Sequence, residues 1–178
     1  RGLGDVYKRQ QNHIFDAIMT AGAEFGIKPF GIRAMDAMRL EKSYRLVGTE
    51  LSIEYAALES GLHRFVHLNK GDFKGRQHLS EWQEAGFANA MVTLEVHDTT
   101  DADAIGGNPI MLPDGTAIGR ATSGGYGFRL GKSLALAMVR PDLATVGTEL
   151  MIDVLDQRLR ATILEESPYD PDNQRLRA

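Results

Sequence analysis

The spacing of the apolar residues changes near Asn89, and no other feature of the chain limits its fold as strongly. Beyond this point apolar side chains stand at every second position, at Val92, Leu94 and Val96. A period of two is that of a strand with one buried face. The run 134–139 is apolar at consecutive positions and predicts a strand that is buried on both faces. The residues after Asn89 are therefore expected to form a sheet.

Turn signals in the same half predict how these strands are joined. Pro113-Asp114-Gly115 lies between two short extended runs and predicts a turn. Apolar residues alternate over 150–154 and again over 159–163, and Asp156-Gln157-Arg158 between them predicts the turn of a hairpin. Several short strands joined by turns are typical of a small antiparallel β-barrel or a jelly-roll-like domain.

The first half of the chain is predicted to be mainly helical. Three segments are expected to be helices from the spacing of their apolar residues: 13–24, 31–44 and 72–85. Gly26 is expected to cap the first of them, and Trp82 is expected to face inward from the third. Residues 64–68 are predicted to form a short strand. Helices followed by strands give an α+β organisation, with a boundary between Glu84 and Asn89.

The composition excludes several classes of function. The 178 residues include no cysteine, which rules out disulfides, zinc–thiolate sites and catalytic thiols within this chain. A net charge of −4 and a pI near 5.7 argue against a nucleic-acid-binding surface, which needs clustered Lys and Arg. No apolar run approaches the ~20 residues of a membrane-spanning helix.

Two motifs suggest ligand chemistry but lack the pattern that it needs. Gly131-Lys132-Ser133 is similar to the end of a P-loop, but Tyr126 stands where the first glycine of a P-loop belongs, and a strand is predicted next instead of a helix. The nearby glycines are expected to let a barrel strand bend or let backbones approach closely. His63 and His67 have the spacing of a helical metal pair, but their segment is predicted to be extended and no third ligand matches.

Charged residues on the second predicted helix allow two interpretations. Asp36 and Arg39 are three residues apart, and Glu41 and Arg45 four apart, which are the spacings of ion pairs along a helix. In the first interpretation these residues, with Arg33, form a solvated ladder of ion pairs. In the second, one arginine faces a ligand cleft, where a guanidinium binds a carboxylate through two hydrogen bonds.

Six motifs are spread over most of the chain: Met38-Arg39-Leu40-Glu41-Lys42, Lys70-Gly71-Asp72-Phe73-Lys74-Gly75-Arg76, Ser123-Gly124-Gly125-Tyr126-Gly127, Gly131-Lys132-Ser133-Leu134-Ala135-Leu136-Ala137, Val139-Arg140-Pro141 and Glu166-Ser167-Pro168-Tyr169-Asp170-Pro171. Together they resemble the C-terminal part of the glycine-cleavage T-protein (aminomethyltransferase) family. Within that family they are most similar to the folate-binding tail of dimethylglycine and sarcosine dehydrogenases.

This resemblance implies a division of the chain. Residues 11–86 are expected to be the helical remnant of a folate-binding domain, and residues 87–178 a small antiparallel β-barrel. Residues 1–10 do not continue the family pattern, so we expect them to be a non-native scar on an N-terminally truncated chain.

The resemblance also implies where folate binds. The family carries a pattern like Ala-Arg-Asp-x-x-Arg-Leu-Glu, and the corresponding stretch of this chain begins Ala34-Met35-Asp36, so Met35 replaces the arginine that is associated with folate. Arg39, Glu41 and Arg33 are the expected folate-binding residues. Arg33 lies two positions from Met35, which rotates its side chain by about 200° around the helix. Arg39 is alternatively a structural partner of Asp36 or Glu59. No catalytic or metal-binding residue is expected here.

The expected function is that of the C-terminal part of a tetrahydrofolate-dependent one-carbon transfer module of a dimethylglycine or sarcosine dehydrogenase-like flavoenzyme. The chain is expected to hold only part of the tetrahydrofolate site, and FAD is expected to serve an upstream part. The alternatives are a free-standing aminomethyltransferase or related demethylase, and a non-catalytic binding or assembly module of the same fold. Expected partners are folate and the upstream part of the parent chain, with no nucleic acid and no membrane, and the chain alone is expected to be inactive. Residues 1–10 lack the apolar stretch of a secretion signal, so a bacterial cytoplasm or a mitochondrial matrix is expected.

Overall fold

The computed structural model describes the backbone of residues 3–177 and the side chains of residues 10–177. The chain divides into two compact units, Arg1–Ile32 and Arg33–Ala178. In the first unit, α1 (Leu3–Gly22) continues into the 3₁₀ turn η1 (Ala23–Phe25), which Gly26 ends in the left-handed conformation. The predicted first helix and its glycine cap are therefore confirmed, although the helix begins earlier than expected.

The domain boundaries predicted from the sequence stay predictions. Of the segment 1–10, residues 1 and 2 lie outside the described residues, and residues 3–10 belong to α1. The expected boundary between residues 86 and 87 falls within the second unit, in the link between its last helix and its first strand.

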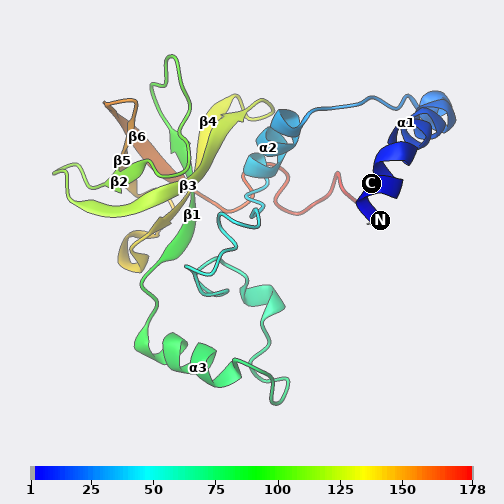
Figure 1. Cartoon of the computed structure of the whole chain (residues 1–178). Helices are drawn as coiled ribbons and strands as arrows, with labels where there is room; N and C mark the ends of the chain where they lie inside the picture. The colour runs from blue at the N-terminus through cyan, green and yellow to red at the C-terminus, as the bar shows by residue number, and fades with distance from the viewer. Residues whose placement is uncertain (1–2, 178) are drawn as a thin grey trace. The chain divides into compact units, whose positions relative to one another are not determined.

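The second unit contains a closed barrel of antiparallel strands (Figure 1). The strands are β1 (Ala90–Val96), β2 (Pro109–Met111), β3 (Ala117–Gly127), β4 (Lys132–Val139), β5 (Glu149–Val154) and β6 (Gln157–Leu164). Their order around the barrel is β1-β4-β3-β2-β5-β6, and β6 pairs with β1 to close it. The predicted α+β fold with a small antiparallel barrel is confirmed. Of the two predicted forms, the structure has the closed barrel and not the jelly roll.

The two faces of β4 explain why its apolar run is continuous. Ala135, Ala137 and Val139 belong to the core inside the barrel. Leu134 and Leu136, on the other face, pack against Leu40 of α2 (Ile32–Glu41) outside it. No residue from 134 to 139 is more than 1% exposed. The prediction of a strand buried on both faces is therefore confirmed, and it shows that α2 covers the outer face of β4.

The ends of the helices differ from the prediction for local reasons. α2 stops at Glu41, before the expected residue 44, because Ser43 has a left-handed φ of 54°. α3 (Arg76–Ala85) begins only after Gly75, whose φ is 90°. None of its residues is buried, and Trp82 is 52% exposed. The prediction that Trp82 faces inward is wrong, because Trp82 lines an open hollow beside Ala56 and Glu59 instead of packing in a core cluster.

The short strand predicted over 64–68 is also wrong. This segment begins within the 3₁₀ turn η2 (His63–Phe65). A further 3₁₀ turn, η3 (Pro141–Leu143), follows β4. A strand needs a partner strand, and a barrel that closes on itself leaves no edge for another one. His63 and His67 therefore lie in a turn and its continuation instead of an extended segment.

The β5–β6 turn allows the first test of the fold. Its residues Leu155 and Asp156 both have a positive φ, 47° and 62°, as in a type I′ turn. A left-handed conformation costs about 1–2 kcal/mol for most residues, whereas asparagine tolerates it. Leu155 is 72% exposed, so little apolar burial is lost with it. We expect Leu155→Asn to raise the free energy of unfolding by about 0.5–1 kcal/mol in urea denaturation.

The control for this prediction is Val146→Asn. Val146 is 55% exposed and is not among the residues with positive φ, so the same change of polarity brings no conformational benefit there. Equal effects of the two substitutions on the free energy of unfolding would show that the turn conformation is not the cause.

Candidate functional site

Arg39, a predicted site residue, lies at the end of α2 in a cluster of charges. Its Nε lies 3.0 Å from Oδ1 of Asp36, and its Nη1 lies 3.5 Å from Oε2 of Glu50. The Arg39 side chain is only 12% exposed. The predicted pairing with Asp36 is confirmed. The alternative pairing with Glu59 is wrong, because backbone N–H groups occupy the Glu59 carboxylate.

Glu50, which the sequence analysis did not single out, is the fully buried carboxylate of this cluster. The hydroxyls of Thr122 and Ser123 both donate to its Oε1, each at 2.5 Å. Consecutive residues of a strand normally point to opposite faces, but a β-bulge of β3 at this position turns both hydroxyls to one side. The N–H of Leu46 and the hydroxyl of Thr49 donate to Oε2 at 2.9 and 2.7 Å.

The pKa of the Glu50 carboxyl reflects two opposing effects. Burial raises this pKa, but the hydrogen bonds from Ser123, Thr122, Leu46 and Thr49 together outweigh burial and hold the pKa below its ordinary value of 4.5. Glu50 is therefore ionised at neutral pH. It serves as the acceptor that joins α2, through Arg39, to strand β3.

Glu41, the second predicted site residue, connects α2 to the tip of the β3–β4 hairpin. Its side chain is buried, and its Oε1 accepts hydrogen bonds from the N–H groups of Arg129 at 2.6 Å and Leu130 at 3.1 Å. The predicted ion pair between Glu41 and Arg45 is wrong, because α2 ends at Glu41 and no further helical turn carries Arg45 back toward it. Arg45 instead pairs with Glu166.

A hollow of about 500 Å³ lies between α2 and this hairpin. It is lined by Arg33, Ala34, Ala37, Met38 and Glu41 from the helix and by Phe128 and Arg129 from the hairpin. Two of the three predicted site residues, Arg33 and Glu41, thus meet in one place, whereas Arg39 does not line it. Figure 1 shows α2 beside the barrel at the end of β3 and β4 that carries the hairpin.

The chemistry of this hollow suits an anion that also carries an apolar group. Phe128 is 78% exposed and Met38 is 49% exposed, so together they offer an open apolar surface. Neither Arg33 nor Arg129 forms an ion pair with any residue that the structure describes. Two guanidinium groups beside an apolar surface can bind a carboxylate on an aromatic or aliphatic body. Sequence reasoning missed Arg129 and Phe128, because only the fold of the hairpin brings them to α2.

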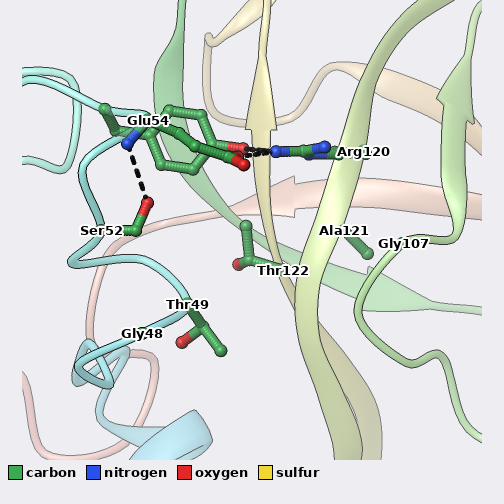
Figure 2. A pocket seen from close by; sticks show the side chains of 9 residues that line it. Gly48, Thr49, Ser52, Glu54, Gly107, Arg120, Ala121 and Thr122 are labelled. Atoms are coloured by element: carbon green, nitrogen blue, oxygen red, sulfur yellow. Dashed lines mark hydrogen bonds and ion pairs between the residues drawn. The ribbon is translucent and has the colours of Figure 1, made fainter.

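A second, smaller hollow of about 200 Å³ lies where the loop after α2 approaches β3 (Figure 2). The cation at this hollow is Arg120, and Figure 2 shows its guanidinium directed at the side chain of Glu54. Arg120 also donates to the hydroxyl of Tyr55 at 2.9 Å. Because Glu54 already compensates the charge of Arg120, we expect this hollow to bind an anion more weakly than the hollow beside α2.

Two further kinds of site are not found in the described part of the chain. No three His, Asp or Glu side chains among the described residues are grouped so that they could hold a metal ion. The longest described helix, α1, has 20 residues, but neither it nor any other described helix is apolar enough to cross a membrane.

Comparison with known proteins gives matches along most of the chain. The family model for the glycine cleavage T-protein C-terminal barrel domain matches residues 89–170, and that for the GCVT N-terminal domain matches residues 5–70. The mitochondrial dimethylglycine dehydrogenase of Homo sapiens is 39% identical over 165 residues, which are 91% of this chain and 19% of that protein. The aminomethyltransferase of Moorella thermoacetica is 37% identical over 152 residues, 83% of this chain and 40% of that protein.

A solved structure shares the fold. The crystal structure of the glycine cleavage system aminomethyltransferase T from Bartonella henselae matches with a TM-score of 0.73 and 22% sequence identity, over 79% of this chain and 39% of that chain. The chain thus spans well under half of the length of these relatives.

Proposed function

Because the chain belongs to the glycine-cleavage T-protein (aminomethyltransferase) family, we propose that it serves a tetrahydrofolate-dependent transfer of one-carbon units. The observation that carries this proposal is the similarity to dimethylglycine dehydrogenase along 91% of the chain. The finer proposal is that the chain works within a dimethylglycine or sarcosine dehydrogenase-like flavoenzyme whose FAD is held outside these 178 residues.

The hollow beside α2 is the proposed site for the tail of the folate. That half of the molecule consists of an aromatic ring joined to a glutamate, so it combines an apolar body with carboxylates. Arg33 and Arg129 would bind a carboxylate, and Phe128 with Met38 would contact the ring. Glu41 acts there through its hydrogen bond to the backbone of Arg129, which holds the hairpin against the helix.

Arg39 stays a predicted folate-binding residue, but we propose a direct contact with the ligand for Arg33 before Arg39. Its Nε and Nη1 already bond Asp36 and Glu50, which leaves it fewer donors for a ligand. Its proposed contribution is to hold α2 against β3 through the Glu50 cluster.

The test is a calorimetric titration with tetrahydrofolate of the intact parent enzyme that carries this chain, and each substitution is made within that enzyme. We expect Arg33→Ala and Arg129→Ala each to weaken binding at least about tenfold, since a hydrogen bond to a charged group contributes roughly 1.5–3 kcal/mol and about 1.4 kcal/mol is a factor of ten. Arg158→Ala is the control, because its ion pair with Asp153 lies on the β5–β6 hairpin. A pterin without the glutamate should bind the Arg33 variant and the unmodified enzyme equally.

Three outcomes of this titration decide between the roles. Absence of tetrahydrofolate binding by the unmodified enzyme contradicts the proposal. If the Arg33 and Arg129 variants both bind tetrahydrofolate with unchanged affinity, the hollow beside α2 is not the folate-binding site. For Arg39→Ala, unchanged affinity with a lower melting temperature assigns Arg39 a structural role, and weaker binding without a lower melting temperature assigns it to the ligand.

Two alternatives each rest on one observation. Met35, at the position of a folate-associated family arginine, favours a non-catalytic binding or assembly module, which would bind no tetrahydrofolate in the same titration. Similarity to the aminomethyltransferase of Moorella thermoacetica favours a flavin-free transferase. Heat denaturation of the enzyme purified from its source distinguishes the latter, since only the flavoenzyme releases a yellow chromophore or keeps a covalently bound one.

A further inference from the structure

The C-terminal segment 166–173, which we call the strap, passes over the end of α2. The N–H of Tyr169 donates to the backbone carbonyl of Glu41 at 3.0 Å, and the hydroxyl of Ser167 donates to the carbonyl of Lys42 at 2.8 Å. The N–H of Ser167 donates to the hydroxyl oxygen of Ser43 at 3.0 Å. The last carbonyls of a helix have no partner within the helix, so the strap supplies partners that α2 itself lacks.

Lys42 binds the strap from the helix side. Its Nζ donates to the carbonyl of Asp170 at 2.6 Å and to Oδ1 of Asn173 at 2.8 Å, across more than 120 residues of sequence. These two acceptors are uncharged, and the lysine is half-buried, so the contact is a directional pair of hydrogen bonds. The ammonium group therefore ties the residue directly after α2 to two points on the strap.

The strap has a defined shape of its own. Ser167, Asp170 and Asn173 all have a positive φ, between 49° and 55°. Asp and Asn adopt this conformation more readily than other residues with side chains. The Asp170 carboxylate also accepts hydrogen bonds from the N–H groups of Gln174 and Arg175. Lys42 thus meets a preformed turn, so its hydrogen bonds position the helix against a firm support.

We propose that Lys42 is a positioning residue: it holds the strap on the end of α2 and thereby sets the direction of the helix that carries Arg33. This inference rests on the proposed function, in which Arg33 binds the folate tail. When Lys42 is lost, α2 and the strap separate locally, while the barrel strands keep their own hydrogen bonds. Ligand binding at the hollow weakens although none of the lining residues has changed.

The first experiment needs no ligand. Hydrogen exchange is compared between the unmodified chain, Lys42→Met, Lys42→Arg and the control Lys74→Met, whose lysine is exposed and has no hydrogen bond with a described residue. In Lys42→Met, the amides of Tyr169 and of the last turn of α2 are expected to exchange at least tenfold faster, and those of β4 less than twofold faster. Lys42→Arg should recover most of the protection, since a guanidinium also donates to both acceptors.

Two exchange results would overturn the inference. Unchanged protection of the strap and α2 in Lys42→Met would mean that Lys42 does not hold them. An equal loss of protection in β4 would mean that the lysine supports the whole fold and positions nothing in particular.

The second experiment is the tetrahydrofolate titration of the same substitutions within the intact parent enzyme. We expect the dissociation constant to rise about fivefold to tenfold in Lys42→Met and to stay unchanged in Lys74→Met. Faster exchange with unchanged affinity would overturn the link between the strap and the ligand, and leave the proposed function standing. If the unmodified enzyme binds no tetrahydrofolate, the proposed function and the ligand part of this inference both fail, and exchange still decides whether Lys42 fixes α2.

Discussion

Replacing Glu50 by leucine is expected to lower the free energy of unfolding by about 3–5 kcal/mol, the cost of removing one partner from a buried charged cluster. The carboxylate is fully buried. Without it, the guanidinium of Arg39 loses a partner and the hydroxyl of Ser123 loses its acceptor, while the hydroxyl of Thr122 keeps only the carbonyl of Leu136 at 3.1 Å. Urea denaturation at pH 7 measures the effect.

Glu84→Leu is the matched control for Glu50→Leu. Glu84 is exposed on α3 and makes no hydrogen bond or ion pair with a described residue, so its replacement should change the free energy of unfolding by less than about 0.5 kcal/mol. Similar losses in the two variants would contradict the role assigned to the Glu50 cluster.

The same residue predicts a pH dependence with a definite sign. The pKa of Glu50 in the folded chain lies below its ordinary value of 4.5, so the carboxylate contributes stability above that pH and loses the contribution as the pH falls through the folded pKa. Glu50→Gln carries no such charge. The stability difference between the unmodified chain and Glu50→Gln is therefore expected to be constant near neutrality and to shrink below about pH 4.5. A difference that grows on acidification would contradict this assignment.

Gly124→Ala is expected to cost about 3 kcal/mol, at the upper end of the range for overpacking a core. A Cβ on Gly124 would lie 2.1 Å from the backbone oxygen of Ala104 and 2.6 Å from its carbonyl carbon. Ala104 is itself buried in the barrel core, so its backbone has no room to withdraw. The melting temperature and the urea midpoint should both fall.

The neighbouring glycine of the same motif is the control. A Cβ on Gly125 would lie 3.2 Å from Cδ1 of Leu40, the free end of a side chain that can shift by a few tenths of an ångström. Gly125→Ala should therefore cost less than about 1 kcal/mol. Equal costs at the two positions would show that backbone approach is not what requires glycine at Gly124.

The strands were predictable because their signal is local. Alternation at Val92, Leu94 and Val96 needs only a strand with one buried face, and the continuous run 134–139 needs only a second buried face. The identity of that second surface was not predictable, since Leu40 lies more than ninety residues before Leu134. The strand predicted over 64–68 failed for a related reason: its local pattern was compatible with a strand, but the closed barrel had no edge to pair with it.

At the candidate site too, the sequence predicted the element but not the partners of its individual side chains. The motif around Arg39 and Glu41 marked the correct helix from the sequence, but not the partner of each charge. Glu41 accepts a hydrogen bond from the hairpin backbone instead of pairing with Arg45. Arg39 contacts Glu50 as well as the expected Asp36. Spacing along a helix predicts which side chains are able to meet, whereas burial and the ends of the helix decide which of them do.

The class of fold, the strands of the barrel, the family and the helix that carries the proposed site could all be read from the amino-acid sequence. Three contacts follow only from the folded chain: Arg33 and Arg129 share a hollow, Glu50 is the buried acceptor, and Lys42 donates hydrogen bonds to the C-terminal strap. The physical reason is that periodicity and motifs are properties of neighbouring residues. A hydrogen-bond partner or a shared surface depends on residues that only barrel closure and the docking of α2 bring together.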